Sequence, residues 1–268
     1  MDTIFNNPIT EIIKARHSVR NYENRPLSND LVQKIEKYID NLDNPFNKNI
    51  KVKLLKKDTP DKEFKLGTYG VIKGASYYLA VACKKEDFCF EALGYTFEKV
   101  VLYCTSLGLG TVWLGGTFNK GEFAKAMNLS DDEILPIVSP VGYEGGKKSM
   151  IATLIGNNNS KRKKYSELFF DNSFNNPLSK NLSKEYIGAL EMVRVAPSSV
   201  NKQPWRVVKI NNDFHFYNVS KRDMNKIDIG IALCHFHLTL LESGINKKFE
   251  FKNPKIDTNY DYVISLVD

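Results

Sequence analysis

The fold is decided by one stretch of the chain, Ala196-Pro197-Ser198-Ser199-Val200-Asn201-Lys202-Gln203-Pro204-Trp205. It combines small hydroxyls, an amide, two prolines and a tryptophan, which few helix-interior or core positions require. Ser198, Ser199 and Asn201 can donate and accept hydrogen bonds, and Pro197 and Pro204 restrict the backbone. We therefore expect a rigid loop that holds a polar ligand.

A second motif lies near the start of the chain and reads Arg16-His17-Ser18-Val19-Arg20. It follows residues 9–16, where Ile9, Ile12 and Ile13 predict one apolar side of a short helix. The planar guanidinium of arginine can bind two oxygens of a phosphate at once. Taken alone, the motif also fits a surface helix end whose cations complement the helix dipole.

Together the two motifs resemble those of the FMN-dependent nitroreductase family. Members of that family carry both motifs close together in one subunit, and they build the flavin site from both subunits of a dimer. In this chain almost the whole sequence separates them. The resemblance therefore implies a single-chain nitroreductase type, in which two half-sites are fused into one polypeptide.

Internal similarity also predicts a fused repeat. Residues 24–28, Asn-Arg-Pro-Leu-Ser, recur as Asn-Asn-Pro-Leu-Ser at 175–179, each time where a serine can cap the following helix. Ala92-Leu93-Gly94 opens an amphipathic run that ends at Gly108, and Asp228-Ile229-Gly230 opens one that ends at Gly244. We expect two tandem halves, residues 1–160 and a degenerate half at 161–268.

The two halves differ in complementary places. The counterparts of Arg16, Ser18 and Arg20 are Glu167, Phe169 and Asp171, which would repel a phosphate. The counterpart of residues 197–205 is residues 46–54, which lack the small hydroxyls. The sequence therefore predicts one FMN per chain, in a site that combines the first motif of one half with the loop of the other. The chain is then expected to be a monomer, with a homodimer as the alternative.

The element pattern predicts an α+β fold, a nitroreductase-like α/β sandwich in which the two halves form a pseudo-dimer. Residues 50–55 alternate as a half-buried strand does, and residues 74–82 form a continuous β-prone run. A helix over about 91–106 leads through Gly108-Leu109-Gly110 into a strand at 111–116. Those glycines follow a helix and not a strand, so we interpret them as a turn and not as a dinucleotide-binding motif.

The resemblance implies specific roles in the site. Arg20 would meet the negative charge that forms at flavin N1 and the C2 carbonyl, and Gly115 and Gly116 would bring backbone N–H groups near N5. Gln203 can instead bond its own backbone. The basic run 161–164 can be a solvated linker between the halves. Alternatively it contacts the phosphate, and Arg162 is then the residue that the resemblance assigns to this contact. The full predicted cofactor-binding set is Arg16, His17, Ser18, Arg20, Leu114, Gly115, Gly116, Arg162, Pro197, Ser198, Ser199, Asn201 and Gln203.

Composition and charge argue against several other classes of protein. The net charge of +7 would suit nucleic acid, but the lysines are interleaved with acids and no nucleic-acid motif occurs, so we expect no such partner. No apolar run reaches the ~20 residues of a membrane span, and the first six residues lack a signal-peptide pattern, which predicts a cytoplasmic protein. The four cysteines have no C-x-x-C spacing. His235 and His237 do not share a helix face, so we expect no metal.

The sequence thus predicts an oxidoreductase that uses FMN, takes hydride from NADH or NADPH and passes it to a small oxidised acceptor such as a nitro compound or a quinone. Nothing in the sequence selects the acceptor. The alternative is a flavin-binding protein without turnover, which stores or senses the cofactor.

Overall fold

A computed structural model describes residues 5, 7–57, 65–145 and 161–268 of the chain. The predicted boundary between residues 160 and 161 borders on residues 146–160, which lie outside the described residues, as do residues 1–4 and 6 at the start. The helices are α1 (Ile9–Ala15), α2 (Asn29–Ile39), α3 (Cys89–Ser106), α4 (Lys120–Met127), α6 (Tyr165–Leu168), α7 (Ile187–Val195) and α8 (Asp223–Glu242), with 3₁₀ segments η2 (Lys180–Tyr186) and η3 (Ser199–Asn201). The strands are β1 (Ile50–Lys56), β2 (Tyr77–Lys84), β3 (Gly110–Thr111), β4 (Glu133–Gly142), β5 (Phe169–Asp171), β6 (Trp205–Ile210), β7 (Asp213–Asn218), β8 (Lys248–Glu250) and β9 (Asp261–Val267).

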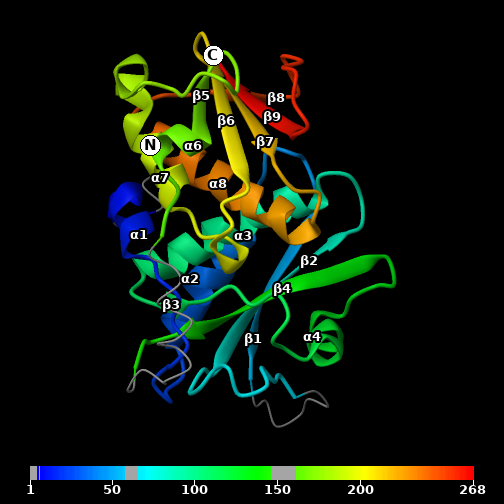
Figure 1. The fold of residues 1–268 in the computed structure, drawn as a ribbon. Helices are drawn as coiled ribbons and strands as arrows, with labels where there is room; N and C mark the ends of the chain where they lie inside the picture. Colours follow the sequence, from blue (N-terminus) through cyan, green and yellow to red (C-terminus); the bar gives the residue numbers. More distant parts are fainter. Residues whose placement is uncertain (1–4, 6, 58–64, 146–160) are drawn as a thin grey trace.

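The strands form two separate sheets, with the long helices α3 and α8 between them (Figure 1). The first sheet has the order β1-β2-β4-β3 and the second β5-β6-β7-β9-β8. All pairs are antiparallel except β5 with β6. Apart from β5, the two sheets thus have the same number of strands and the same place for their long helix. The predicted α+β class is confirmed.

The predicted central strand is buried on both faces. Leu79, Val81 and Cys83 of β2 point into the core beneath α3. Tyr78 and Ala80 point to the other face, where α4 covers them with Phe123 and other apolar side chains. A strand covered on both sides reads as a continuous apolar run, which is why the sequence pattern found it.

The two central helices cross where each carries a glycine. A Cβ at Gly94 would lie 2.1 Å from the carbonyl oxygen of Ile227, and one at Gly230 would lie 2.1 Å from that of Glu91. Neither helix backbone could approach so closely with any other residue at its crossing point. Both helices also end in a left-handed glycine, Gly108 with φ 75° and Gly244 with φ 74°.

Two predicted strands have different bounds in the structure. The strand expected from residue 74 begins at Tyr77, because Gly74 has φ 78° and a Cβ there would lie 2.0 Å from the Tyr22 carbonyl oxygen. The strand expected over 111–116 is limited to Gly110–Thr111. Beyond it the chain turns away, and Leu114 alone pairs with Val138 of β4.

The predicted serine caps lie at the start of both halves' helices. Ser28 accepts a hydrogen bond from the Leu31 N–H at 3.3 Å and begins α2. Ser179 accepts one from the Asn181 N–H at 3.3 Å, but it begins the 3₁₀ segment η2, which bends at Ser183 before α7.

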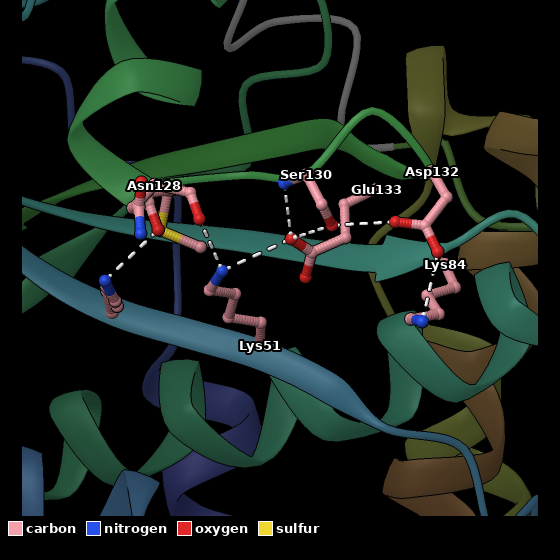
Figure 2. Close-up of polar contacts among 8 residues, drawn as sticks. Lys51, Lys84, Asn128, Ser130, Asp132 and Glu133 are labelled. Atoms are coloured by element: carbon pink, nitrogen blue, oxygen red, sulfur yellow. Dashed lines mark hydrogen bonds and ion pairs between the residues drawn. The ribbon is translucent and has the colours of Figure 1, made fainter.

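Some of the scattered lysines form hydrogen bonds and ion pairs between elements of the fold. Figure 2 shows Lys51 of β1, which donates to the Asn128 carbonyl at the end of α4 at 2.9 Å and to Glu133 at 3.3 Å. Lys84 pairs with Asp132 at 3.0 Å in the same group. A lysine at the last carbonyls of a helix also complements the helix dipole.

All four cysteines are buried and free. Of the helices that the structure describes, none is long and apolar enough to cross a membrane.

Candidate functional site

A cavity of about 680 Å³ lies at the junction of the two predicted halves. It brings together most of the predicted site residues, although the two motifs are nearly the whole chain apart in sequence. The lining comprises Arg16, Ser18, Arg20, Val112, Trp113, Gly115, Gly116, Ile137, Arg162, Pro197, Ser198, Ser199, Val200, Met224, Ile227, Asp228 and Ile231.

The first motif lines the cavity because it runs as an extended segment beside β3. Val19 donates its N–H to the Thr111 carbonyl at 2.9 Å, and Ser18 forms a parallel bridge with Thr111. Gly110 permits this pairing, since a Cβ there would lie 2.7 Å from the Val19 side chain. Alternate residues of an extended chain share a face, so Arg16, Ser18 and Arg20 all reach the cavity.

Arg16 is the most unusual side chain of the site. Its Nε and Nη1 atoms are buried, and neither has a hydrogen-bond partner among the described residues. Burial lowers the pKa of Arg16, and the charge of Glu98 partly opposes that shift. A buried guanidinium without partners is costly to fold. Its donors therefore indicate a ligand that accepts hydrogen bonds.

Arg162 adds a second positive charge. Its Nη1 donates to the Ala196 carbonyl at 2.7 Å and to Asn201 Oδ1 at 3.0 Å. Burial, with the nearby charges of Arg16 and Arg194, lowers the pKa of Arg162 to about 10. Within the described part of the chain, no carboxylate forms an ion pair with Arg16, Arg20 or Arg162. The cavity is therefore electropositive and suited to an anion.

The loop 196–205 is held in a strained conformation by its own side chains. Ser198 Oγ accepts the Gln203 N–H at 2.9 Å, and Gln203 Nε2 donates to the Asn201 carbonyl at 3.0 Å. Val200, Asn201 and Gln203 have φ of 45°, 57° and 50°. A β-branched residue rarely adopts such a backbone, yet Val200 is 82% exposed at the cavity wall. Strain of this kind is concentrated at functional sites.

Four predicted contact residues do not line the cavity. His17 bonds the Ala15 carbonyl at 3.0 Å and Glu144 at 2.8 Å, and its side chain is 62% exposed. Leu114 exchanges both backbone hydrogen bonds with Val138. Asn201 and Gln203 support Arg162 and the loop. In the structure these residues position the cavity lining.

Gly115 and Gly116 present backbone to the cavity. In the described part of the chain, neither N–H donates a hydrogen bond. A Cβ at Gly116 would have no heavy atom within 4 Å, whereas one at Gly115 would lie 2.6 Å from the Met224 methyl group. The N–H groups are thus free for a ligand, and the missing side chains leave room for it.

The sequence analysis missed the wall formed by α8. Met224, Ile227, Asp228 and Ile231 lie at spacing i, i+3, i+4 and i+7, and all four line the cavity. That spacing is visible in the sequence, but it is also typical of a helix face that packs in the core. Asp228 is 3% exposed, and burial raises its pKa to about 7.

A buried polar group lies behind the cavity and holds Trp113 in place. Trp113 Nε1 donates to Glu98 Oε2 at 3.0 Å, and Glu98 Oε1 bonds His235 Nε2 at 2.8 Å. His235 Nδ1 bonds the Met192 carbonyl at 3.0 Å. The group joins α3 to α8 and to α7. His237 instead bonds Tyr95 at 2.6 Å, so the two histidines serve different contacts.

Three positions that the internal sequence alignment pairs with cavity residues carry aromatic rings. The internal alignment pairs Pro197 with Phe46, and counting along the paired helices pairs Met224 with Phe88 and Gly115 with Phe251. The ring centroids of Phe46 and Phe88 lie 5.7 Å apart, and those of Phe88 and Phe251 lie 4.9 Å apart. We call these three residues the phenylalanine cluster.

Comparison with known proteins gives a consistent result. A sequence model of the family described as "Putative TM nitroreductase" matches residues 8–240. The structure is similar to that of a putative nitroreductase from Thermotoga maritima (tm1586), with a TM-score of 0.65 and 20% identity over 97% of this chain and 94% of that one. Among curated proteins, none matches the sequence.

Two shorter proteins also match about half of the chain. A nitroreductase family protein from Clostridium difficile 630 gives a TM-score of 0.44 at 18% identity, covering 52% of this chain and 86% of that one. A nitroreductase with bound FMN from Desulfitobacterium hafniense gives 0.43 at 18% identity, covering 53% and 92%.

Proposed function

Since the chain belongs to the putative TM nitroreductase family, we propose that it is an FMN-dependent oxidoreductase. It would take hydride from NADH or NADPH and pass it to a small oxidised acceptor, a nitro compound or a quinone. The flavin would supply the redox chemistry, and the protein would supply binding, orientation and charge.

The observation that carries this proposal is the unpartnered guanidinium of Arg16 in an electropositive cavity. The phosphate of FMN is a dianionic acceptor that would satisfy its donors and offset the neighbouring charge of Arg162. The cavity volume of about 680 Å³ lies within the usual range of small-molecule sites. The residues present therefore fit the cofactor.

The remaining lining residues suit the other parts of the cofactor. Ser18, Ser198 and Ser199 offer hydroxyls to the ribityl chain. Arg20 offers a cation that would favour the reduced ring, and the free N–H groups of Gly115 and Gly116 offer donors to it. Burial lowers the pKa of Arg20, but arginine stays charged at neutral pH.

We further propose that each chain holds one flavin and is complete as a monomer. The two sheets flank the central helices in the same way, and those helices meet at equivalent glycines. Only one of the two equivalent places is a cavity lined by arginines among the described residues. The other contains the phenylalanine cluster. Glu167 and Asp171, which the sequence alignment pairs with Arg16 and Arg20, lie elsewhere, because β5 pairs with β6 at the sheet edge opposite β8.

The proposal is tested on the purified protein after reconstitution with FMN. We expect an oxidised flavin spectrum that is retained on gel filtration and is bleached by NADH or NADPH under anaerobic conditions. A bound flavin that neither nicotinamide reduces would favour storage or sensing. Failure to retain FMN would contradict both the oxidoreductase and the flavin-storage or flavin-sensing function.

A further inference from the structure

One wall of the cavity is a face of α8 on which a single carboxyl interrupts an apolar surface. Met224, Ile227 and Ile231 surround Asp228 on this face. Asp228 is the one carboxylic acid among the described residues of the lining. Burying a carboxyl at a ligand cavity costs free energy, and such groups are often functional.

The contacts of Asp228 hold it in place without neutralising it. Oδ1 accepts the Ser199 N–H at 2.9 Å, and Oδ2 accepts Asn225 Nδ2 at 3.1 Å. No described cation forms an ion pair with it. Burial raises the pKa of Asp228 to about 7, while the two hydrogen bonds and the charge of Lys202 act in the opposite direction. Near neutral pH the group can both hold and release a proton.

The other charged groups around Asp228 do not compete for this role. They are Asp223 and Lys226 on α8, Glu91 on α3, Lys202 on the loop, and Arg16, Arg20 and Arg162 on the cavity walls. Asp223 and Lys226 pair with each other at 3.9 Å. Burial also raises the pKa of Glu91, but Glu91 does not line the cavity. The arginines retain their protons throughout the neutral range.

Reduction of the acceptor requires such a group, if the proposed function holds. When a hydride reaches a quinone or a nitro compound, negative charge develops on an acceptor oxygen. In a partly apolar cavity that charge is unstable until a proton neutralises it. A general acid in contact with the oxygen lowers this barrier, and its efficiency is greatest when its pKa lies near the working pH.

We propose that Asp228 donates the proton to the acceptor oxygen. The Oδ–H bond of the carboxyl breaks and an O–H bond forms on the acceptor, while the hydride, with its two electrons, comes from the reduced flavin. A quinone thereby becomes a hydroquinone, because the hydride and this one proton together supply both added hydrogens, and water then returns a proton to the carboxylate. The inference rests on the proposed function.

The internal alignment agrees with a role in chemistry. The counterpart of Asp228 in the other half is Ala92, which is fully buried in the same helix crossing. Packing at the crossing therefore does not need a carboxyl. The acid occurs only in the half whose helix faces the cavity.

Asparagine is a suitable replacement, because it removes the acid and keeps the anchor of the loop. In Asp228→Asn, the amide oxygen of the new side chain could still accept the Ser199 N–H. Asn225 Oδ1 has no partner among the described residues, so the Asn225 amide could turn and accept a hydrogen bond from the new amide. Asp223→Asn is the matched control, with the same change of charge on the same helix outside the cavity.

The test reduces the bound flavin chemically and mixes it with one of two oxidants. A benzoquinone needs a proton as well as electrons, whereas ferricyanide takes single electrons and no proton. In the wild type the ratio of the quinone rate to the ferricyanide rate should fall as pH rises through the pKa of Asp228. In Asp228→Asn that ratio should be lower by about 10²-fold and should not depend on pH. Asp223→Asn should behave as the wild type does.

Infrared titration of the cofactor-free protein gives a readout that does not depend on activity. A protonated carboxyl band that disappears near neutral pH should be present in the wild type and absent from Asp228→Asn. A wild-type rate ratio in Asp228→Asn would overturn the proposal, as would an equal loss of both rates. Failure of the proposed function would appear separately, as a wild-type protein that retains no flavin.

Discussion

The cavity and the phenylalanine cluster stand at corresponding positions of the internal sequence alignment, and their side chains differ in volume. At the cavity, Pro197, Met224 and Gly115 leave open space. At the cluster, three phenylalanine rings occupy the equivalent positions and pack on one another. The aligned positions therefore differ in side-chain volume, with a cavity in one place and packed rings in the other.

The charged residues differ in the same way. Arg16 lacks hydrogen-bond partners at two buried nitrogens, as a group reserved for a ligand does. Glu167, its counterpart in the sequence alignment, accepts the Lys164 N–H at 2.7 Å, and Asp171 accepts the side-chain amide of Asn172 at 3.0 Å. The alignment does not hold in space, because β5 pairs with β6 at the sheet edge opposite β8. The carboxylates thus stabilise local turns. The two unsatisfied donors at the cavity therefore cost stability that the hydrogen-bonded carboxylates do not.

The largest effect is expected from Arg16→Met, which keeps much of the volume and removes the charge. Two lost charge-assisted hydrogen bonds to phosphate should lower FMN affinity by about 10²-fold or more. In the cofactor-free protein, the same change should raise the free energy of unfolding by about 1–3 kcal/mol, because the unpaired donors are gone. Fluorescence titration and urea unfolding measure the two quantities. Arg25→Met, at an exposed arginine that pairs with Glu23 and stacks on Tyr143 outside the cavity, should leave FMN affinity unchanged and should not raise stability. A stability loss in Arg16→Met would contradict the assignment.

The next largest effect is expected from a side chain that fills the open space at Gly116. Gly116→Leu should lower FMN affinity by about 10- to 100-fold, since overpacking costs about 1–3 kcal/mol. It should leave the cofactor-free fold intact, because nothing lies within 4 Å of a Cβ there. Gly188→Leu, at an exposed position of α7 with equally open space, is the control. Unchanged affinity in Gly116→Leu would place the flavin elsewhere.

A smaller effect is expected from Asn201→Ala, which removes the side-chain acceptor of Arg162. FMN affinity should fall by about tenfold, the effect of one hydrogen bond to a charged group. Asn211→Ala is a matched control, because Asn211 has nearly the same left-handed backbone, φ 55° against 57°, outside the cavity. If both variants bind FMN alike, Asn201 does not position Arg162.

An effect of a different kind is expected in the pH dependence of stability. The pKa of Asp228 is raised in the folded state to about 7, so its contribution is present below about pH 4 and is lost as pH rises toward 7. The wild type should lose stability relative to Asp228→Asn across this window, by at most about 1.4 kcal/mol per pH unit. Urea unfolding of the cofactor-free proteins between pH 4 and 8 measures it. Parallel curves would mean that the carboxyl has an ordinary pKa.

Much of the fold could be predicted because its signals are local. The run that forms most of β2 is apolar, and the helix α3 keeps its apolar spacing almost to Gly108. Residues 111–116 resemble a strand in their apolar composition, whereas the chain turns away after Thr111. Only tertiary contacts decide how far such a run stays paired.

The site was predictable where a motif carries it, as in Arg16, Ser18 and the loop serines. Contacts between residues that are far apart in the sequence could not be predicted. Asn201 accepts a hydrogen bond from Arg162, and Gln203 accepts one from the Lys163 N–H, about forty residues earlier in each case. No local sequence pattern indicates these contacts. Asp228 escaped notice because its helical spacing resembles ordinary core packing until the opposite wall of the cavity is known.

The central claim is that one chain holds one flavin in a site made from both of its halves. Flavin released from the reconstituted protein, measured against protein concentration, tests it directly when light scattering on the same sample gives the mass. We expect one FMN per chain in a particle with the mass of a single chain. Two FMN per chain would contradict the account, because the place of the phenylalanine cluster would then have to hold a second cofactor.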